Sequence, residues 1–280
     1  MTVDSGSQTA IAPDGTRLFV SERGHGDDVL FIPGLGYATW CWHYQAGPVS
    51  QVARLLLMDN RGAGRSDKPS GPYSIAQMAD DAYQVLNQRA AGPAHVVGAS
   101  MGGYIALTLA LRHPDAVASL VLLATTCGGT GSRGVPADTQ TAWAAAVPLG
   151  SAGFARATMP LSFAPGWAEE HPAEFEQLLA LRLRAKTPTE CWRSQYKACA
   201  SYLRDGLPPG PISQPAVIVH GTADRVVPYE NAAHLARRLP QASVVTLNGA
   251  GHLCWIERAD VVNRIITSAM TDCMTGRVSS

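Results

Sequence analysis

The sequence predicts an α/β fold with a mainly parallel sheet that is covered by helices on both faces. Short runs rich in leucine and β-branched residues alternate with longer segments of helical periodicity, which is typical of βαβ units. The runs are apolar almost throughout, as expected for strands that are buried on both sides. A chain of 280 residues can form one such domain with an insertion.

The alternation places each expected element of this domain. The strands are expected at residues 17–22, 28–33, 53–59, 94–99, 118–125, 215–221 and 243–249. The helices are expected at residues 40–52, 74–90, 102–112, 229–239 and 258–271. In the last helix apolar residues recur on one helical face, which indicates packing against a core.

The alternation stops after residue 126 and resumes at residue 215, a stretch too long for a simple connection. It opens with CGGTGSRG and closes with LPPGPISQP, both rich in helix breakers, and helical patterns lie between them at 139–150 and 172–185. We therefore predict a core domain formed by residues 1–126 and 215–280, and a helical cap, or lid, formed by residues 127–214.

Composition limits the partners that this chain can be expected to have. The 22 Lys and Arg residues balance the 22 Asp and Glu residues, so neither nucleic acid nor an anionic membrane surface is expected to bind. The first ten residues lack the pattern of a secretory signal and no run resembles a membrane span, which favours a cytoplasmic protein. The six cysteines, Cys273 among them, show no CxxC pair or zinc-ligand spacing, so we expect neither a disulfide nor a metal site.

The segment GASMG, residues 98–102, has the G-x-S-x-G pattern of a nucleophile turn between a strand and a helix. Such a turn is so tight that the residues two before and two after the serine cannot carry side chains, and Gly98 and Gly102 meet this demand. The turn would present Ser100 at the carboxyl edge of the sheet, where ligands bind in open α/β folds. The motif alone leaves open a glycine turn with an incidental serine.

A serine hydroxyl needs a base to remove its proton and an acid to orient that base. Asp224 follows the strand at 215–221 and His252 follows the strand at 243–249, which gives the order serine, acid, histidine. The strand at 118–125 ends without a carboxylate, which favours Asp224 as the acid. Each of the two residues alone could be an ordinary loop residue, but together with Ser100 they predict a catalytic triad.

Attack on an ester also requires N–H donors for the oxyanion. We expect one from Met101, directly after the serine, and the other from Leu35 in the glycine loop PGLGY, residues 33–37. The side chains expected to line the substrate pocket, with simple packing as the alternative for the aromatic residues, are Tyr37, Trp40, Trp42, His43 and Trp143.

Five segments, PGLG, MDNRGAGRSDKP, GASMGG, VHGTADRVVP and GAGHLCWIE, resemble in this order the successive motifs of the α/β-hydrolase fold superfamily. The resemblance extends over essentially the whole chain and is greatest to the branch of 3-oxoadipate enol-lactonases and small carboxylesterases. It implies an eight-stranded, mostly parallel sheet, a helical lid after the sixth strand, and chemistry without a cofactor. It also implies that Asp59 and Arg61 form internal hydrogen bonds rather than act on substrate. Pro33 replaces the histidine usual before the oxyanion glycine, which removes a donor and an anchor for this loop.

We therefore expect a serine hydrolase that cleaves a small-molecule carboxylic ester or lactone of mainly apolar character through an acyl-enzyme on Ser100. No cofactor and no metal are expected, and a homo-oligomer is left open. The alternatives are a cofactor-free perhydrolase or haloperoxidase, a carbon–carbon hydrolase or lyase on the same triad, and a ligand-binding protein of the same fold without turnover. The absence of an HGxGPG-type loop disfavours the ring-cleavage type of carbon–carbon hydrolase.

Overall fold

The central sheet of the computed structural model, which describes residues 4–275, has eight strands in the order β1-β2-β4-β3-β5-β6-β7-β8. β2 runs antiparallel to β1 and to β4, and all the other neighbours are parallel. The predicted α/β fold with a mostly parallel eight-stranded sheet is therefore confirmed. The strands are β1 (Asp4–Ile11), β2 (Arg17–Gly24), β3 (Asp28–Ile32), β4 (Arg54–Met58), β5 (Ala94–Ala99), β6 (Val117–Leu123), β7 (Ala216–Gly221) and β8 (Ser243–Leu247).

The strands expected from the alternation all form, but β1 was not predicted from the residue pattern. Its sequence, DSGSQTAI, holds mostly small and polar residues of low strand propensity. β1 lies at the edge of the sheet and pairs only with β2, so it does not need the apolar run that marks a buried strand.

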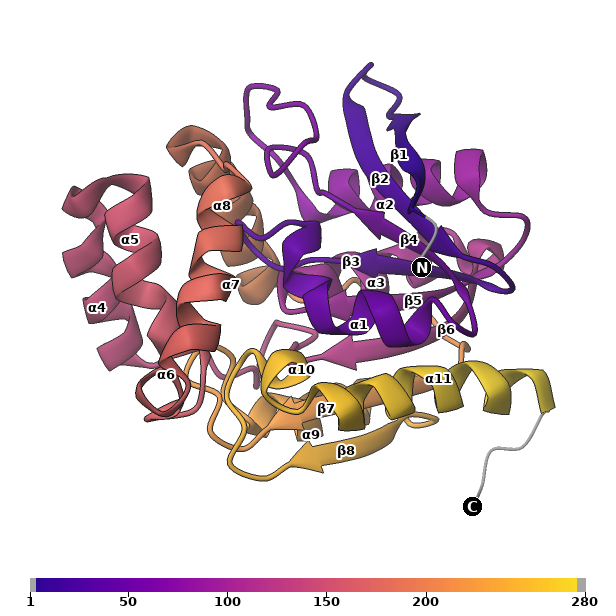
Figure 1. Ribbon diagram of the computed structural model, residues 1–280. Coiled ribbons are helices and arrows are strands. Elements are labelled where there is room, and N and C mark those ends of the chain that lie inside the picture. Colours follow the sequence, from indigo (N-terminus) through magenta and orange to yellow (C-terminus); the bar gives the residue numbers. More distant parts are fainter. Residues whose placement is uncertain (1–3, 276–280) are drawn as a thin grey trace.

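Helices cover both faces of the sheet (Figure 1). α1 and α11 pack on one face, whereas α2, α3 and α9 pack on the other. The predicted helix at 40–52 is a short 3-10 helix, η1 (Thr39–Trp42), followed by α1. The helices outside the segment between β6 and β7 are α1 (His43–Val49), α2 (Ile75–Arg89), α3 (Met101–Arg112), α9 (Glu230–Arg238), α10 (Cys254–Glu257) and α11 (Ala259–Thr275), with the 3-10 turn η2 (Pro114–Ala116) after α3.

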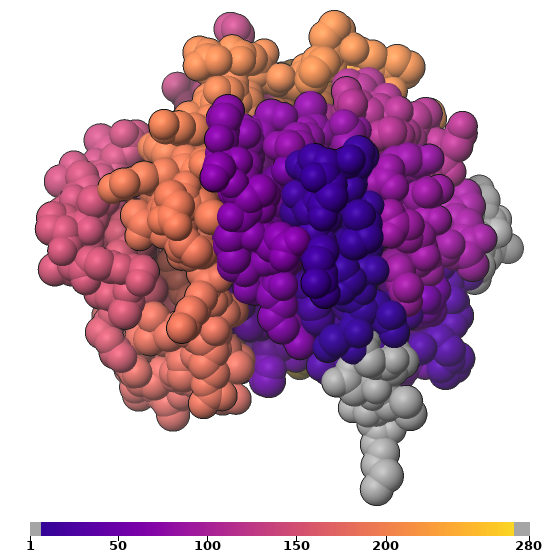
Figure 2. Space-filling view, turned by 90° about the horizontal axis from the view of Figure 1, so that it is seen from above, coloured from indigo at the N-terminus to yellow at the C-terminus, as the bar shows by residue number. Residues whose placement is uncertain are grey.

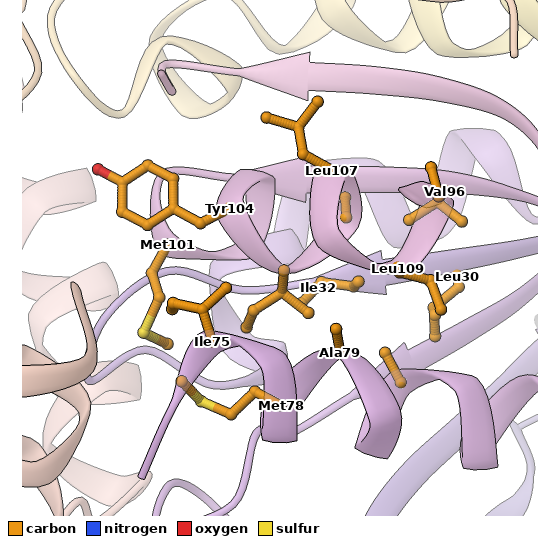
Figure 3. Packing of buried hydrophobic residues seen from close by; sticks show 14 of the residues in the cluster. Leu30, Ile32, Ile75, Met78, Ala79, Val96, Met101, Tyr104, Leu107 and Leu109 are labelled. Atoms are coloured by element: carbon orange, nitrogen blue, oxygen red, sulfur yellow. The ribbon is translucent and has the colours of Figure 1, made fainter. Parts of the chain in front are cut away.

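The packing between α2, α3 and the sheet fixes the start of α3, which follows Ser100. Figure 3 shows Ile75 and Met78 of α2 beside Met101 of α3, and Ile32 of β3 belongs to the same buried cluster. Ile32, Met78 and Met101 are all fully buried. Burial of each such side chain stabilises the fold by about 1.5–3 kcal/mol. The first turn of α3 is thus held in the core and cannot shift relative to β3.

The segment between β6 and β7, which is called the cap below, folds into helices that lie together at one end of the sheet (Figure 1). Sequence patterns predicted only two of them, corresponding to α4 and α7. α7 joins the core on the α1 side of the sheet, and α8 joins the core on the α2 side. These helices are α4 (Ala137–Ala146), α5 (Gly150–Thr158), α6 (Trp167–Glu170), α7 (Pro172–Arg184) and α8 (Thr189–Asp205), with the 3-10 turns η3 (Val147–Leu149) and η4 (Met159–Ser162).

α8 lies directly beside the loop that precedes α2. In Figure 2 the orange residues of the cap lie against the violet residues of this loop. A Cβ atom on Gly62 would come within 3.0 Å of the Cβ of Cys191, and one on Gly71 would overlap the side chain of Ser194.

Within residues 4–275, no helix has both the length and the apolar character needed to cross a membrane.

The order of the strands creates a topological switch point between β3 and β5. From β3 the chain moves to β4 on one side, and it returns to place β5 on the other side of β3. The loops that leave β3 and β5 therefore diverge and open a crevice at the carboxyl edge, where ligands bind in this type of sheet. These two loops are the glycine loop at 33–37 and the serine turn at Ser100.

Buried charges hold the loop after β4 rigid. The Arg61 guanidinium donates to both oxygens of Asp81 at 2.5 and 2.6 Å and to Asp14 at 2.8 Å. Burial alone would lower the pKa of Arg61, but the bonds to Asp81 and Asp14 raise it above its ordinary value. Asp59 accepts the backbone N–H groups of Thr39 at 2.6 Å and Arg65 at 2.8 Å. As the resemblance implied, Asp59 and Arg61 make internal bonds.

We predict that Arg61→Met destabilises the fold by about 3–5 kcal/mol, because it leaves the Asp81 carboxylate buried without its partner. Urea unfolding followed by circular dichroism measures this change. Arg156→Met, which removes the exposed pair with Glu176, should leave the unfolding midpoint nearly unchanged. Equal midpoints for the two variants would contradict the stabilising role of the buried pair.

Candidate active site

Ser100 stands at a strained turn between β5 and α3. Its φ of 54° and ψ of −119° lie outside the regions that side-chain-bearing residues usually adopt. The Ser100 N–H donates to the Leu123 carbonyl at 2.9 Å, and the Thr125 hydroxyl donates to the Ser100 carbonyl at 2.8 Å. Hydrogen bonds on both sides of the residue thus hold a conformation that costs roughly 1–3 kcal/mol.

The glycines around Ser100 are required by close backbone contacts. A Cβ atom on Gly98 would overlap the Gly102 carbonyl, and one on Gly102 would overlap the Ile32 carbonyl at the end of β3. A Cβ atom on Gly34 would lie 3.2 Å from the Cβ of Ser100. The serine turn, the start of α3 and the glycine loop after β3 therefore meet in contact with one another.

Asp224 and His252 lie side by side at the ends of β7 and β8. The Nδ1 of His252 is 2.8 Å from the Oδ2 of Asp224, and both side chains are buried. The Oδ1 of Asp224 accepts the backbone N–H groups of Val226 at 2.8 Å and Val227 at 2.9 Å. The loop therefore directs one carboxylate oxygen of Asp224 at the imidazole of His252 and supplies backbone hydrogen bonds to the other oxygen.

Asp224 keeps its negative charge although it is buried. Burial alone would raise its pKa, but its electrostatic interaction with the neighbouring His252 and the hydrogen bonds from His220 and His252 hold the pKa well below the ordinary value. An ionised carboxylate can only accept hydrogen bonds, so the Nδ1 of His252 must carry the proton. The Nε2 of neutral His252 is then free to accept a proton.

Ser100, His252 and Leu35 line one cavity of about 80 Å³ at the switch point. The structure thus brings the predicted serine, histidine and glycine loop together, with Asp224 behind the histidine. Within residues 4–275, the backbone N–H groups of Leu35 and Met101 have no protein acceptor. Both N–H groups are therefore unpaired within the described part of the chain.

Of the five side chains expected to line the pocket, Tyr37 and Trp143 do so. The prediction was wrong for the others. Trp40 packs behind the ring of Tyr37, and Trp42 is fully buried between Phe31 and Trp255 in the core. His43 is exposed and packs against Tyr44. Residues 39–49 form the helices η1 and α1, which direct these side chains away from the crevice. The position of these residues just after the glycine loop in the sequence could not reveal this direction.

Several side chains of the cavity were not predicted. Val226 and Trp255 come shortly after Asp224 and His252, so their places in the two loops were a usable signal. Phe154 and Trp192 are aromatic residues of the cap, and their places in the sequence did not show that they would face this cavity. The other unpredicted side chains of the cavity are Thr158, Ser162 and Arg182. No sequence pattern singled out Arg182.

A second, larger cavity of about 410 Å³ lies beside the first, between the cap and Gly36 of the glycine loop. Phe154, Arg182 and Trp192 line both cavities and so form the wall between them. The rings of Phe154 and Trp192 meet edge to face with centroids 5.3 Å apart, and the Arg182 guanidinium lies 5.0 Å from the ring centre of Tyr37. Among the described residues, no cluster of histidine, cysteine and acidic side chains could hold a metal ion, and the side chain of Cys273 lies outside them.

A strained serine at the switch point of a mostly parallel sheet, with a buried acid and a histidine after the last strands, is the arrangement of enzymes with a nucleophile turn. The chain belongs to the alpha/beta hydrolase fold family, whose sequence pattern matches residues 28–259. The resemblance found in the sequence is thereby confirmed.

Known proteins similar to this chain include hydrolases of several kinds. The 2-hydroxymuconate semialdehyde hydrolase of Pseudomonas putida is 28% identical over 270 residues, which cover 92% of each chain. The enol-lactonase structure from Burkholderia xenovorans LB400 has a TM-score of 0.81 and 27% identity, and the match covers 94% of this chain and 100% of that one. An esterase from Exiguobacterium antarcticum shares the fold at 22% identity, with a TM-score of 0.80 and coverage of 94% and 98%. This chain is therefore a hydrolase of the α/β fold.

We predict that Gly102→Ala destabilises the protein by about 3 kcal/mol or more, because the new methyl group overlaps the Ile32 carbonyl and must displace backbone. Thermal unfolding measures the loss. Gly134→Ala is the control, since a Cβ there meets no atom within 4 Å, and it should change stability by less than about 0.5 kcal/mol. A Gly102→Ala protein as stable as this control would show that the turn tolerates a wider spacing from β3.

Proposed function

We propose that this protein is a serine hydrolase that cleaves a carboxylic ester or lactone through an acyl-enzyme on Ser100. The observation that carries the proposal is the shared cavity of Ser100 and His252, with the Nδ1 of His252 bonded to ionised Asp224. The unpaired N–H groups of Leu35 and Met101 support it further, because an oxyanion needs such donors.

In the first step the Nε2 of His252 removes the proton of the Ser100 hydroxyl while the serine oxygen attacks the carbonyl carbon of the substrate. The carbonyl π electrons move onto oxygen, and the Leu35 and Met101 N–H groups stabilise that oxyanion. When the carbonyl forms again, the bond to the leaving oxygen breaks and this oxygen takes the proton from His252. An ester loses its alcohol at this point, whereas a lactone opens its ring.

Water completes the reaction on the same groups. His252 removes a proton from a water molecule whose oxygen attacks the acyl carbon, and the second tetrahedral intermediate uses the same two N–H donors. Its collapse breaks the bond to Ser100, which recovers its proton from His252, and releases the carboxylic acid. Asp224 keeps the Nδ1 proton of His252 in place and stabilises the imidazolium in both steps.

The walls of the cavity favour a small substrate with an apolar body and an anionic group. The volume of about 80 Å³ beside Ser100 is bounded by aromatic rings, among them Tyr37, Trp143 and Trp255. Arg182 adds a guanidinium to this wall and has no acidic partner among the described residues. A guanidinium binds a carboxylate through two parallel hydrogen bonds. The substrate that we propose is therefore a carboxylate-bearing ester or lactone, and the lactone option agrees with the similarity to the enol-lactonase.

Carbon–carbon hydrolysis is a second candidate, because the relative from Pseudomonas putida that matches nearly the whole chain is a semialdehyde hydrolase. The loop PGLGY of this chain lacks the HGxGPG pattern, and this absence disfavours carbon–carbon hydrolysis of the ring-cleavage type. Perhydrolysis and ligand binding without turnover use the same cavity. Perhydrolysis yields a peracid and ligand binding yields no product, so measuring the products distinguishes both from ester hydrolysis.

We predict that wild-type protein turns over at least one member of a panel of short acyl esters, enol-lactones and saturated lactones. Ser100→Ala should reduce kcat by about 10⁴-fold or more, because it removes the attacking oxygen. A vinylogous diketone acid and a mixture of acetate and hydrogen peroxide in the same panel detect carbon–carbon hydrolysis and peracid formation. Multiple turnovers that persist in Ser100→Ala would rule out this mechanism.

We predict that Arg182→Gln raises KM about tenfold for a substrate that carries a carboxylate, since a hydrogen bond to a charged group contributes about 1.5–3 kcal/mol. The neutral amide analogue of that substrate should show a change of less than about twofold. Arg184→Gln is the matched control, because Arg184 lies on the same helix and is exposed. Steady-state kinetics on the two substrates measure the difference, and equal effects on both would argue against an anion site.

A further inference from the structure

We propose that Gln195 of α8 is a positioning residue that holds the glycine loop in the conformation needed for its oxyanion donor. The inference rests on the proposed function, since it assigns a task to the Leu35 N–H. It concerns a residue of the cap that neither lines the catalytic cavity nor contacts Ser100. Gln195 acts through the backbone of Gly36.

The side chain of Gln195 joins two backbone segments that are far apart in the sequence. Its Oε1 accepts the Gly36 N–H at 2.9 Å, and its Nε2 donates to the Arg61 carbonyl at 2.8 Å. Gln195 is completely buried, although it lies on an otherwise apolar helix face with Cys191, Ala198 and Tyr202. A buried amide on such a face is costly unless both of its ends are bonded, and here both are.

The bond to Gly36 selects the shape of the loop. Residues 34–37 form a β-turn that is closed by the Tyr37 N–H and the Gly34 carbonyl at 3.1 Å. Gly36 has a φ of 68°, and Leu35 is not among the residues with positive φ, which together define a type II turn. The alternative type I turn rotates the peptide between Leu35 and Gly36 and would carry the Gly36 N–H away from Gln195. The amide oxygen of Gln195 therefore favours the type II form.

Further contacts from the cap fix the same peptide. A Cβ atom on Gly36 would lie 2.6 Å from the Cδ1 of Trp192, so this residue packs directly on α8. The Thr187 hydroxyl donates to the Gly36 carbonyl at 3.3 Å. Both polar groups of Gly36 are bonded to the cap, whereas the preceding N–H of Leu35 has no acceptor among the described residues. This N–H is the donor assigned to the oxyanion.

The other end of the Gln195 side chain rests on a rigid support. The Arg61 segment is held by the buried bonds of its guanidinium to Asp81 and Asp14. The neighbouring Asn60 donates from its Nδ2 to the Pro33 carbonyl at 2.9 Å, just before the glycine loop. Pro33 has no N–H and offers no side-chain donor, so the anchor that a histidine would supply at this position is absent. Gln195 supplies an anchor from the opposite side of the loop.

The first test is the kinetics of Gln195→Met, which keeps the length of the side chain and removes both hydrogen bonds. We expect kcat to fall about tenfold or more while KM stays within about twofold, because the lost contact acts on the transition state more than on bound substrate. Gln214→Met is the matched control. Gln214 is also buried and donates to a backbone carbonyl, that of Pro114, but away from the site, so its loss should leave kcat unchanged.

The second test uses Gln195→Glu and covers the case in which Gln195→Met does not fold. A protonated carboxyl group can accept the Gly36 N–H and donate to the Arg61 carbonyl, as the amide does, whereas a carboxylate has no proton for that carbonyl. Burial raises the pKa of carboxyl groups in general. The ratio of the kcat of Gln195→Glu to that of the wild type should therefore rise as the pH falls from 8 to 5. Dividing the two kcat values cancels the pH dependence that the variant and the wild type have in common.

The outcomes separate this inference from the proposed function. If the wild type shows no turnover that depends on Ser100, the proposed function fails and the task of the loop fails with it. If that turnover is present, but Gln195→Met keeps its kcat or the Gln195→Glu ratio is flat with pH, the positioning role alone is overturned. A fall in kcat with constant KM, together with a ratio that rises in acid, supports it.

Discussion

The close contact between the start of α3 and the end of β3 is the constraint on which the site depends. Gly102 packs on the Ile32 carbonyl without room for a methyl group, so α3 begins where the glycine loop leaves the sheet. The same contact keeps Ser100 in its strained conformation, because the turn cannot relax without moving a helix that is buried in the core. One steric relationship thus sets the positions of the serine and of the unpaired N–H groups of Leu35 and Met101.

The electrostatic part of the site is built from a different set of contacts at the ends of β7 and β8. Asp224 is buried but keeps two backbone N–H donors and the nearby histidines, so no lysine or arginine is needed to hold its charge. The loop of His252 is tied to the cap, since the Leu253 N–H donates to the Ser162 carbonyl at 2.7 Å. Glu257 accepts the N–H groups of both Gly251 and Ala164. The cap therefore helps to position His252 as well as the glycine loop.

The sequence predicted the features that local rules encode and missed those that depend on tertiary packing. The buried strands and the order of Ser100, Asp224 and His252 follow from periodicity and turn chemistry, whereas β1 is an edge strand whose pattern carries little signal. Trp42 was expected in the pocket, but side-chain direction depends on the turns of η1 and α1, which place it in the core. α8 was not predicted because Gln195 interrupts its apolar face, and that polar residue has its own bonding partners.

These contacts divide the cap into two parts of different stability. α7 and α8 each bury several side chains in the two core layers, and α8 also bonds the glycine loop. α4 and α5 bury only two residues each, and the turn between them exposes Val147 and Leu149. Segments with few buried contacts open at the lowest free energy. Local opening of the cap therefore costs least at α4 and α5, which carry Trp143 and Phe154, and it leaves in place α8, which bonds the glycine loop.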